Sequence, residues 1–297
     1  SGLSEPVNSG KVRNQGVEAT VGYNFWFGKN WSWKTAYNVS FNDNKILETS
    51  YEKDGSEKLI YQDVAGVRVR YRKGGSIGDM YVTDFKRDEN GHYVISSNGK
   101  PQMETEANKM YTIYAGNMNS KWQMGWSNTI KFKDFTLFFL INGRIGGKVI
   151  SLTEAYLDNL GLSKRTADAR MNAEANKIIA TEYGNEAGMV LPDGSGRIVP
   201  IKAYYQSIGG TPNPSQYIYN GTNFRLRELS LGYTFRNLLG ENKNLTLSFI
   251  GRNLFFIYKD CPTDPDVSLS TTNGLGAFEL FNMPTSRSYG FSLNINF

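Results

Sequence analysis

Residue types that commonly carry out chemistry are sparse in this sequence. Asp264 and Asp266 flank a proline in TDPDV, and paired acids of this kind could ligate Ca²⁺ or serve acid–base chemistry. His92 is the only histidine and Cys261 the only cysteine, so a histidine-based metal cluster, a Ser-His-Asp triad or an intrachain disulfide is not expected from this chain alone. The stretch GGSIGD lacks the Lys-Ser/Thr that follows a phosphate-binding loop. We therefore predict a protein that is not an enzyme and has neither a cofactor nor a metal site.

The composition favours β structure and argues against nucleic acid as a partner. The net charge is +5, but the 33 Lys and Arg residues are spread among 28 acids and form no basic stripe. Aromatic residues make up 13% of the chain and Gly is frequent, a combination typical of strands and turns. The longest apolar run lies within FTLFFLI, well below the roughly 18 residues that a transmembrane helix needs.

Long stretches alternate apolar and polar residues, as β-strands with one apolar face do. Three predicted hairpins are GVEATVGYNFWF with WSWKTAYNVSFN, KWQMGWSNTIKF with FTLFFLING, and RELSLGYTF with NLTLSFIGRNLFF. A weaker pair is VAGVRVRYR with DMYVTDF, and a last strand covers residues 286–297. Together these segments predict about nine strands of membrane-spanning length.

The connections between these strands alternate in length. Those at 28–30, 73–78, 133–134 and 236–243 are tight, whereas those at 43–63, 87–120, 149–221 and 257–285 are long and polar. Short turns on one rim and long loops on the other are typical of outer-membrane barrels. Within one long connection, Ser151 and Glu154 have the spacing of a capping box, and the Ala-rich residues 166–180 predict a second helix. We expect both helices outside the barrel wall.

A soluble β-sheet would show the same alternation, so other features must distinguish it from a membrane barrel. Arms of about 10 to 12 residues match a tilted strand that crosses the hydrocarbon, and aromatic residues gather around the turn at 28–30. An odd number of strands cannot close a single-chain bacterial barrel. Either partner strands lie upstream or the count is wrong.

Four blocks of the sequence, in order, resemble the C-terminal part of the SusC/RagA-like family, the TonB-dependent outer-membrane transporters of Bacteroidetes-type bacteria. The blocks are NSGKVRNQGVEATVGY, NFRLRELSLGYTF, GRNLFFIYKDCPTDPDV and MPTSRSYGFSLNINF. They extend over nearly the whole chain, and residues 149–221 show the least likeness. The resemblance favours a shared turn, rather than a metal site, at Asp264 and Asp266.

The resemblance implies an all-β fold, an antiparallel transmembrane β-barrel segment that supplies about nine strands of a roughly 22-stranded barrel. Residues 1–297 would be the C-terminal part of the barrel, without the plug domain and the earlier strands, and 149–221 a large extracellular loop region containing short helices. The implied partners are the lipid bilayer, a SusD-like surface lipoprotein, the remainder of the same transporter, and the TonB complex, contacted through the missing N-terminal region. The implied function is active import of oligosaccharides or peptides across the bacterial outer membrane.

In such a family the last strand is also a signal for the outer-membrane assembly machinery. Its alternate residues would carry that signal: Tyr289, Phe291, Leu293, Ile295 and Phe297. Several side chains could touch a substrate, but the sequence does not distinguish that role from packing in the aromatic girdle or in loops, so we predict no contact residue among them: Trp26, Lys34, Glu228, Tyr204 and Tyr205. Two alternative functions remain open at this point, a self-standing outer-membrane barrel with an adhesin or structural role and a soluble β-rich glycan-binding module.

Overall fold

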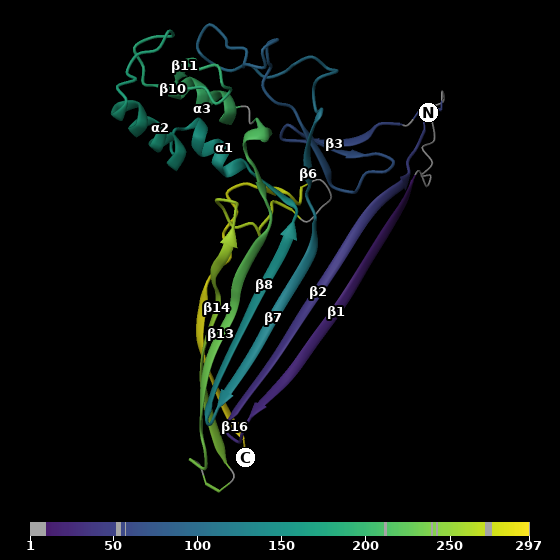
Figure 1. The fold of residues 1–297 in the computed structure, drawn as a ribbon, viewed down its shortest axis with the longest axis vertical. Coiled ribbons are helices and arrows are strands. Elements are labelled where there is room, and N and C mark those ends of the chain that lie inside the picture. The colour runs from purple at the N-terminus through teal and green to yellow at the C-terminus, as the bar shows by residue number, and fades with distance from the viewer. Residues whose placement is uncertain are drawn as a thin grey trace, which may run out of the picture.

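The computed structural model describes residues 10–51, 55–56, 58–210, 213–238, 240–241, 243–270 and 275–296. A long seven-stranded antiparallel sheet, here called the wall, runs down the molecule (Figure 1). Its strands are, in spatial order, β1 (Lys11–Phe27), β2 (Trp31–Glu48), β7 (Ser120–Phe132), β8 (Phe135–Gly146), β13 (Asn223–Phe235), β14 (Asn244–Lys259) and β16 (Ser288–Asn296). The described parts of residues 49–119, 147–222 and 260–287 form a second body at one end of the wall, here called the head.

The register of the wall gives it one apolar and one polar face, because directly paired residues of neighbouring strands share a face. One row across all seven strands consists of Phe27, Trp31, Phe132, Phe135, Tyr233, Leu247 and Leu293. The adjacent row on the other face consists of Trp26, Ser32, Lys131, Thr136, Gly232, Ser248 and Ser292. The tight connections at 28–30, 133–134 and 236–243 all lie at the end away from the head.

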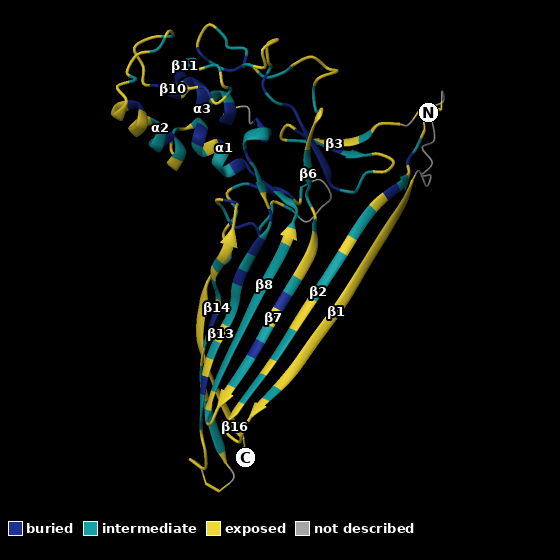
Figure 2. Cartoon of the chain, in the orientation of Figure 1, coloured by how far each residue is buried: buried dark blue, intermediate teal, exposed yellow. Residues whose placement is uncertain are grey.

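Many residues of the wall strands are exposed (Figure 2), and they include large side chains of the apolar face. Val21 is 71% and Phe291 78% exposed. Near the tight turns the exposed face is aromatic, with ring centroids 5.0 Å apart for Phe25 and Trp33 and 4.7 Å apart for Phe135 and Tyr233. An apolar surface of this extent is unusual on a soluble monomer.

The head contains three small sheets and three α-helices. Its sheets are β3 (Ile60–Val64), β4 (Val67–Tyr71), β5 (Asp79–Val82) and β6 (Ile113–Asn117); β12 (Ile218–Asn220), β9 (Lys148–Ser151) and β15 (Phe278–Glu279); and β10 (Gly188–Val190) with β11 (Ile198–Pro200). Its helices are α1 (Leu152–Asn159), α2 (Lys164–Ala175) and α3 (Ile201–Gly209), with a 3-10 turn η1 (Pro214–Gln216). Among the described residues, no helix is long and apolar enough to span a bilayer.

The hydrophobic core lies in the head, and distant segments build it together. One cluster joins Val69, Ile150 and Phe278, each fully buried, from three different connections between wall strands. A second cluster packs Phe85 with Ile208 and Tyr217. The long connections are therefore a folded body with its own core and not separate loops.

Several predictions of the sequence analysis are confirmed. The all-β antiparallel fold, the three long hairpins and the last strand are present. The Oγ of Ser151 caps α1 by accepting a hydrogen bond from the backbone N–H of Glu154 at 3.2 Å. The second helix begins earlier than predicted, at Lys164, because the side chain of Ser163 caps it, and it ends at Ala175 with Asn176 as its C-cap. Helix α3 was not predicted, and its N-terminal residue Pro200 offers no side-chain cap.

The count of about nine wall strands is wrong, since the described wall has seven. β4 and β5 are only five and four residues long and lie in the head. The apolar residues of β4 alternate because one of its faces is buried in the head core, as Val67 shows, whereas all four residues of β5 are buried. The turn at 73–78 lies near the head end of β2, where Ile46 N donates to Gly75 O at 2.8 Å.

Candidate functional site

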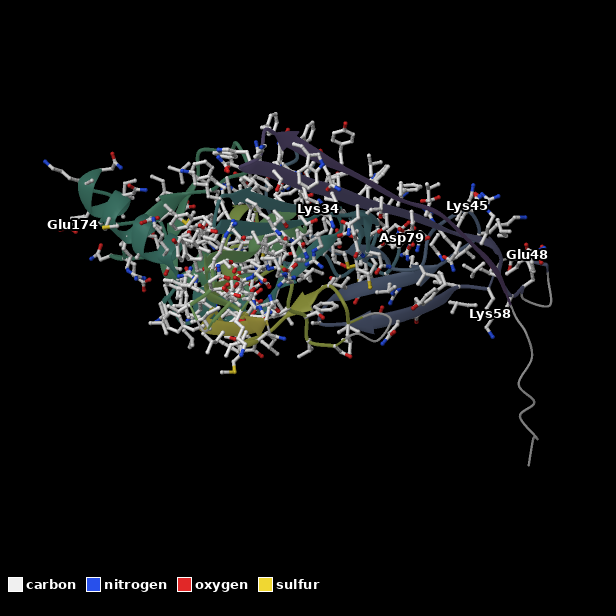
Figure 3. All side chains as sticks on the ribbon, turned by 90° about the horizontal axis from the view of Figure 1, so that it is seen from below. Lys34, Lys45, Glu48, Lys58, Asp79 and Glu174 are labelled. Atoms are coloured by element: carbon white, nitrogen blue, oxygen red, sulfur yellow. The ribbon has the colours of Figure 1, made fainter. Side chains whose placement is uncertain are left out.

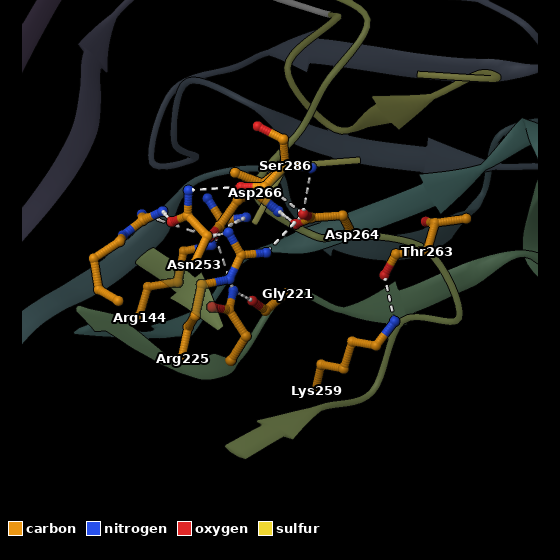
Figure 4. A network of polar contacts seen from close by, with 12 residues as sticks. Arg144, Gly221, Arg225, Asn253, Lys259, Thr263, Asp264, Asp266 and Ser286 are labelled. Carbon is orange, nitrogen blue, oxygen red and sulfur yellow. Dashed lines mark hydrogen bonds and ion pairs between the residues drawn. The ribbon is translucent and has the colours of Figure 1, made fainter. Parts of the chain in front are cut away.

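A polar network joins the wall to the head at the upper end of the polar face. Arg225 of β13 and Asp264 of the 260–287 segment form its centre, with side chains only 4% and 5% exposed. The Arg225 Nη2 donates to Asp264 Oδ2 at 2.6 Å (Figure 4). Arg225 also stacks its guanidinium on the ring of Phe256, 3.8 Å from the centroid. A buried charge pair with this geometry fixes one strand to one segment.

Asp264 is saturated with donors. Its Oδ2 also accepts from the backbone N–H of Thr285 at 3.1 Å and from the Thr285 hydroxyl at 2.5 Å. Its Oδ1 accepts from the backbone N–H of Asp266 at 2.9 Å. Burial raises the pKa of the carboxyl, but these hydrogen bonds and that from Arg225 outweigh the burial, so the pKa lies below its ordinary value. Asp264 is therefore an anion at neutral pH.

Asp266 faces three arginines. Its Oδ1 is 3.3 Å from Arg144 Nη2, and its Oδ2 is 3.5 Å from Arg225 Nη1 and 3.8 Å from Arg227 Nη2. The Arg227 Nη1 donates at 2.8 Å to the side-chain oxygen of Asn253, whose amide nitrogen donates at 3.1 Å to Ser286 O. We call Arg144, Arg225, Arg227, Asn253, Asp264, Asp266 and Thr285 the mouth network.

A β-bulge interrupts β13 beside the two arginines that approach Asp266. Leu226 pairs with Ile141 and Glu228 with Leu140, which leaves Arg227 between two register positions. Bulges of this kind change the direction of a side chain without ending the strand. Arg225 and Arg227 are two residues apart, the spacing of side chains on one face of a strand, and both approach Asp266.

The network can hold charge and position a segment, but it has no nucleophile paired with a base. Among the residues that the structure describes, no group of three or more His, Cys, Asp or Glu side chains could hold a metal ion. Asp264 and Asp266 lie in a turn in which Val267 N donates to Asp264 O at 3.4 Å, and arginines face both acids.

The residues predicted to form an assembly signal lie on an edge strand of the wall. Tyr289, Phe291, Leu293 and Ile295 occupy the apolar face of β16, paired with Gly251, Phe249, Leu247 and Leu245 of β14. Phe297 lies outside the described residues. Their role as a signal stays a prediction.

The side chains suggested as substrate contacts divide into two groups. Trp26 and Lys34 lie on the polar face of the wall, where Figure 3 labels Lys34, and Glu228 is ion-paired to Arg252 at 3.0 Å. Tyr204 and Tyr205 are 5% and 8% exposed because α3 directs them into the head core. These two tyrosines are therefore not accessible to a substrate.

No family model matches the chain, but individual known proteins are similar to it. The chain is 23% identical to TonB-dependent receptor P3 of Formosa agariphila, over all of the chain and 30% of that receptor. It is 22% identical to TonB-dependent receptor SusC of Bacteroides thetaiotaomicron, over 88% of the chain and 24% of SusC. The resemblance to SusC/RagA-like TonB-dependent transporters is confirmed. The chain spans less than a third of the length of these relatives.

Solved structures agree on the fold. The RagAB peptide importer in its open-open state matches 97% of the chain and 29% of the matched importer chain, with a TM-score of 0.66 and 16% identity. Its closed-closed state matches with a TM-score of 0.60 and 17% identity, over 97% of the chain and 30% of the matched chain. The wall and head thus have the fold of part of a SusC/RagA-like transporter.

Sequence reasoning missed the mouth network although all of its residues except Arg144 lie inside the SusC-like blocks. Arg225 and Arg227 come from NFRLRELSLGYTF, Asp264 and Asp266 from GRNLFFIYKDCPTDPDV, and Thr285 from MPTSRSYGFSLNINF. The signal that could have found it is opposite charge in blocks that are otherwise mostly apolar and aromatic. Sequence spacing gave no indication that these blocks meet.

Proposed function

We propose that this chain forms a section of the barrel wall and the surface-facing mouth of a SusC-like importer in the bacterial outer membrane. The observation that carries the proposal is the apolar row that crosses all seven strands beside a polar row. Only a lipid-facing wall with a wet interior needs both faces at this length. A soluble glycan-binding module would bury that apolar face.

The proposed cargo is an oligosaccharide or a peptide, which the head receives together with a SusD-like surface lipoprotein. TonB would then disturb the plug domain of the same transporter so that the cargo can pass. The head segments, including 149–221, would lie outside the cell. The mouth network would keep the 260–287 segment attached to the wall while cargo is handed over, and we assign no covalent chemistry to the chain.

Each outer edge of the wall can pair with a further strand. β1 and β16 are the end strands of the sheet, so each has one edge that no described wall strand pairs. Unpaired backbone groups are costly in lipid, and we propose that other strands of the same transporter cover both edges. The proposed assembly signal on β16 would be read before this pairing is complete.

Transport is tested by deleting the gene that carries this sequence and measuring uptake of fluorescent oligosaccharide and peptide pools. We expect uptake of one pool to fall sharply, to return on complementation, and to fall equally when TonB is disabled. Unchanged uptake of both pools, in cells where the wild-type protein is present in the outer membrane, would contradict the proposal.

A further inference from the structure

A cavity of about 490 Å³ lies beside the mouth network, on the polar face of the wall at its head end. β7, β8 and β13 form its floor, with Gln123, Asn142 and Asn223 among the lining residues. Its size suits a single sugar ring or amino-acid residue. A solute that arrives from the head side would meet this cavity before the rest of the polar face.

The charge of the lining is unbalanced. The cavity is lined by Arg144, Lys148, Arg225 and Arg227, and Asp266 is the only acid among the described lining residues. Even with the adjacent Asp264 included, four cations face two carboxylates, which leaves two positive charges. Lys148 forms no ion pair with any described residue.

Buried donors in the same lining have no acceptor. Nη1 of Arg225 and Nε of Arg144 are buried without a hydrogen-bond partner in the described part of the chain. Arg225 Nη1 lies 3.5 Å from Asp266 Oδ2, which is close enough for an ion pair but leaves the nitrogen without a hydrogen bond. The Arg225 side chain is 4% exposed. A buried donor without a partner is unfavourable, and a guanidinium suits a planar oxyanion that can accept two hydrogen bonds.

We propose that this cavity binds a carboxylate of the cargo through Arg225, Arg144 and Lys148. The proposal deepens the proposed function, on which it rests, by restricting the cargo to acidic oligosaccharides or to peptides with an accessible carboxylate. The anion would lie beside the guanidinium groups of Arg225 and Arg144, whose unpartnered nitrogens are closed to solvent in this arrangement and would turn toward it on binding. Lys148 would supply charge from the rim.

Binding to the complete protein that carries this sequence, purified in detergent, tests the proposal with two matched pairs of probes. The first pair is trigalacturonate and its neutral methyl ester, and the second is hexa-alanine and its C-terminal amide. Isothermal titration is run on the wild type, on Lys148→Gln and on Arg236→Gln. Arg236 is a matched control because it also loses one positive charge, from the Arg236–Asp134 pair at the tight-turn end.

We expect the charged member of one pair to bind more tightly than its neutral partner, and that pair identifies sugar or peptide cargo. Lys148→Gln should weaken the charged probe about tenfold, as expected for one charged interaction, and leave the neutral probe unchanged. Arg236→Gln should change neither. Equal binding of charged and neutral probes, no binding by any probe, or an unaltered preference in Lys148→Gln would overturn the anion site. Preferential binding without TonB-dependent uptake would instead overturn the transport function and leave the anion site standing.

Discussion

Replacing Asp264 by Asn removes one charge from the buried centre of the mouth network while keeping its shape. Arg225 would then lie with a 4% exposed side chain and without its partner at 2.6 Å. Breaking a buried pair on one side costs about 3–5 kcal/mol. Asp266 remains 3.5 Å from Nη1 of Arg225, so we expect the lower end, about 3 kcal/mol. That free energy corresponds to a roughly 100-fold change in an equilibrium constant.

The affected equilibrium is local detachment of the 260–287 segment, so the assay must report on that segment. Lys259 and Arg287 flank it and are trypsin sites. Where detachment is fast, the cutting rate follows the population of the detached form. We expect Asp264→Asn to raise that rate about 100-fold. The matched control is Glu228→Gln, which removes an ion pair whose Arg252 side chain is 59% exposed and which should change the rate less than about fivefold.

A second variant tests the physical cause. In Arg225→Met/Asp264→Asn the uncompensated buried charge is gone, so cutting should be slower than in Asp264→Asn alone. The reasoning is refuted if Asp264→Asn is cut at nearly the wild-type rate. It is also refuted if the double variant is cut as fast as expected when the effects of the two substitutions on the free energy of detachment simply add.

Three further predictions follow from the same structure. Because the pKa of Asp264 lies below 3.8 in the folded protein, its contribution to stability is present above about pH 4 and is lost as the pH falls through the lowered value. Hydrogen exchange of residues 264–270 should show this loosening, and a flat profile against pH would contradict it. Phe291→Lys should lower the free energy of unfolding by about 2–4 kcal/mol in urea titrations in lipid, whereas Ser292→Lys on the polar face should lower it by less than about 1 kcal/mol. Equal costs would rule out a lipid-facing surface at Phe291. Removing Phe297 should lower the amount of protein assembled in the outer membrane several-fold without changing refolding of the purified protein into detergent, and normal assembly would remove the proposed signal.

Local patterns made the long hairpins predictable from the sequence. Period-two alternation is a property of each strand by itself, so β1, β2, β7, β8, β13 and β14 could be recognised without knowing their neighbours. The same property caused the error at β4 and β5. Val67 and Val69 alternate with Arg68 and Arg70 because a protein core lies on one side, and the sequence pattern is the same when lipid lies there.

The head core and the mouth network depend on contacts that no local pattern contains. Val69, Ile150 and Phe278 meet from three different connections, and Arg225 meets Asp264 across 39 positions. The blocks that resemble SusC-like transporters identified the right residues but not their contacts. The charge excess of the cavity is equally invisible in the sequence, because it depends on which acids already pair with arginine.

The central claim is that one face of the wall lies in lipid and the other does not. Its most direct test is a spin-label scan along β1 in the complete protein in lipid, at Thr20, Val21, Gly22 and Tyr23, with the buried Cys261 replaced by Ser. Our account predicts that oxygen accessibility alternates with a period of two and is high at Val21 and Tyr23, which lie on the apolar face. It also predicts that a water-soluble nickel reagent does not reach these two positions. Equal oxygen accessibility at all four positions, or ready access of nickel to Val21 and Tyr23, would contradict it.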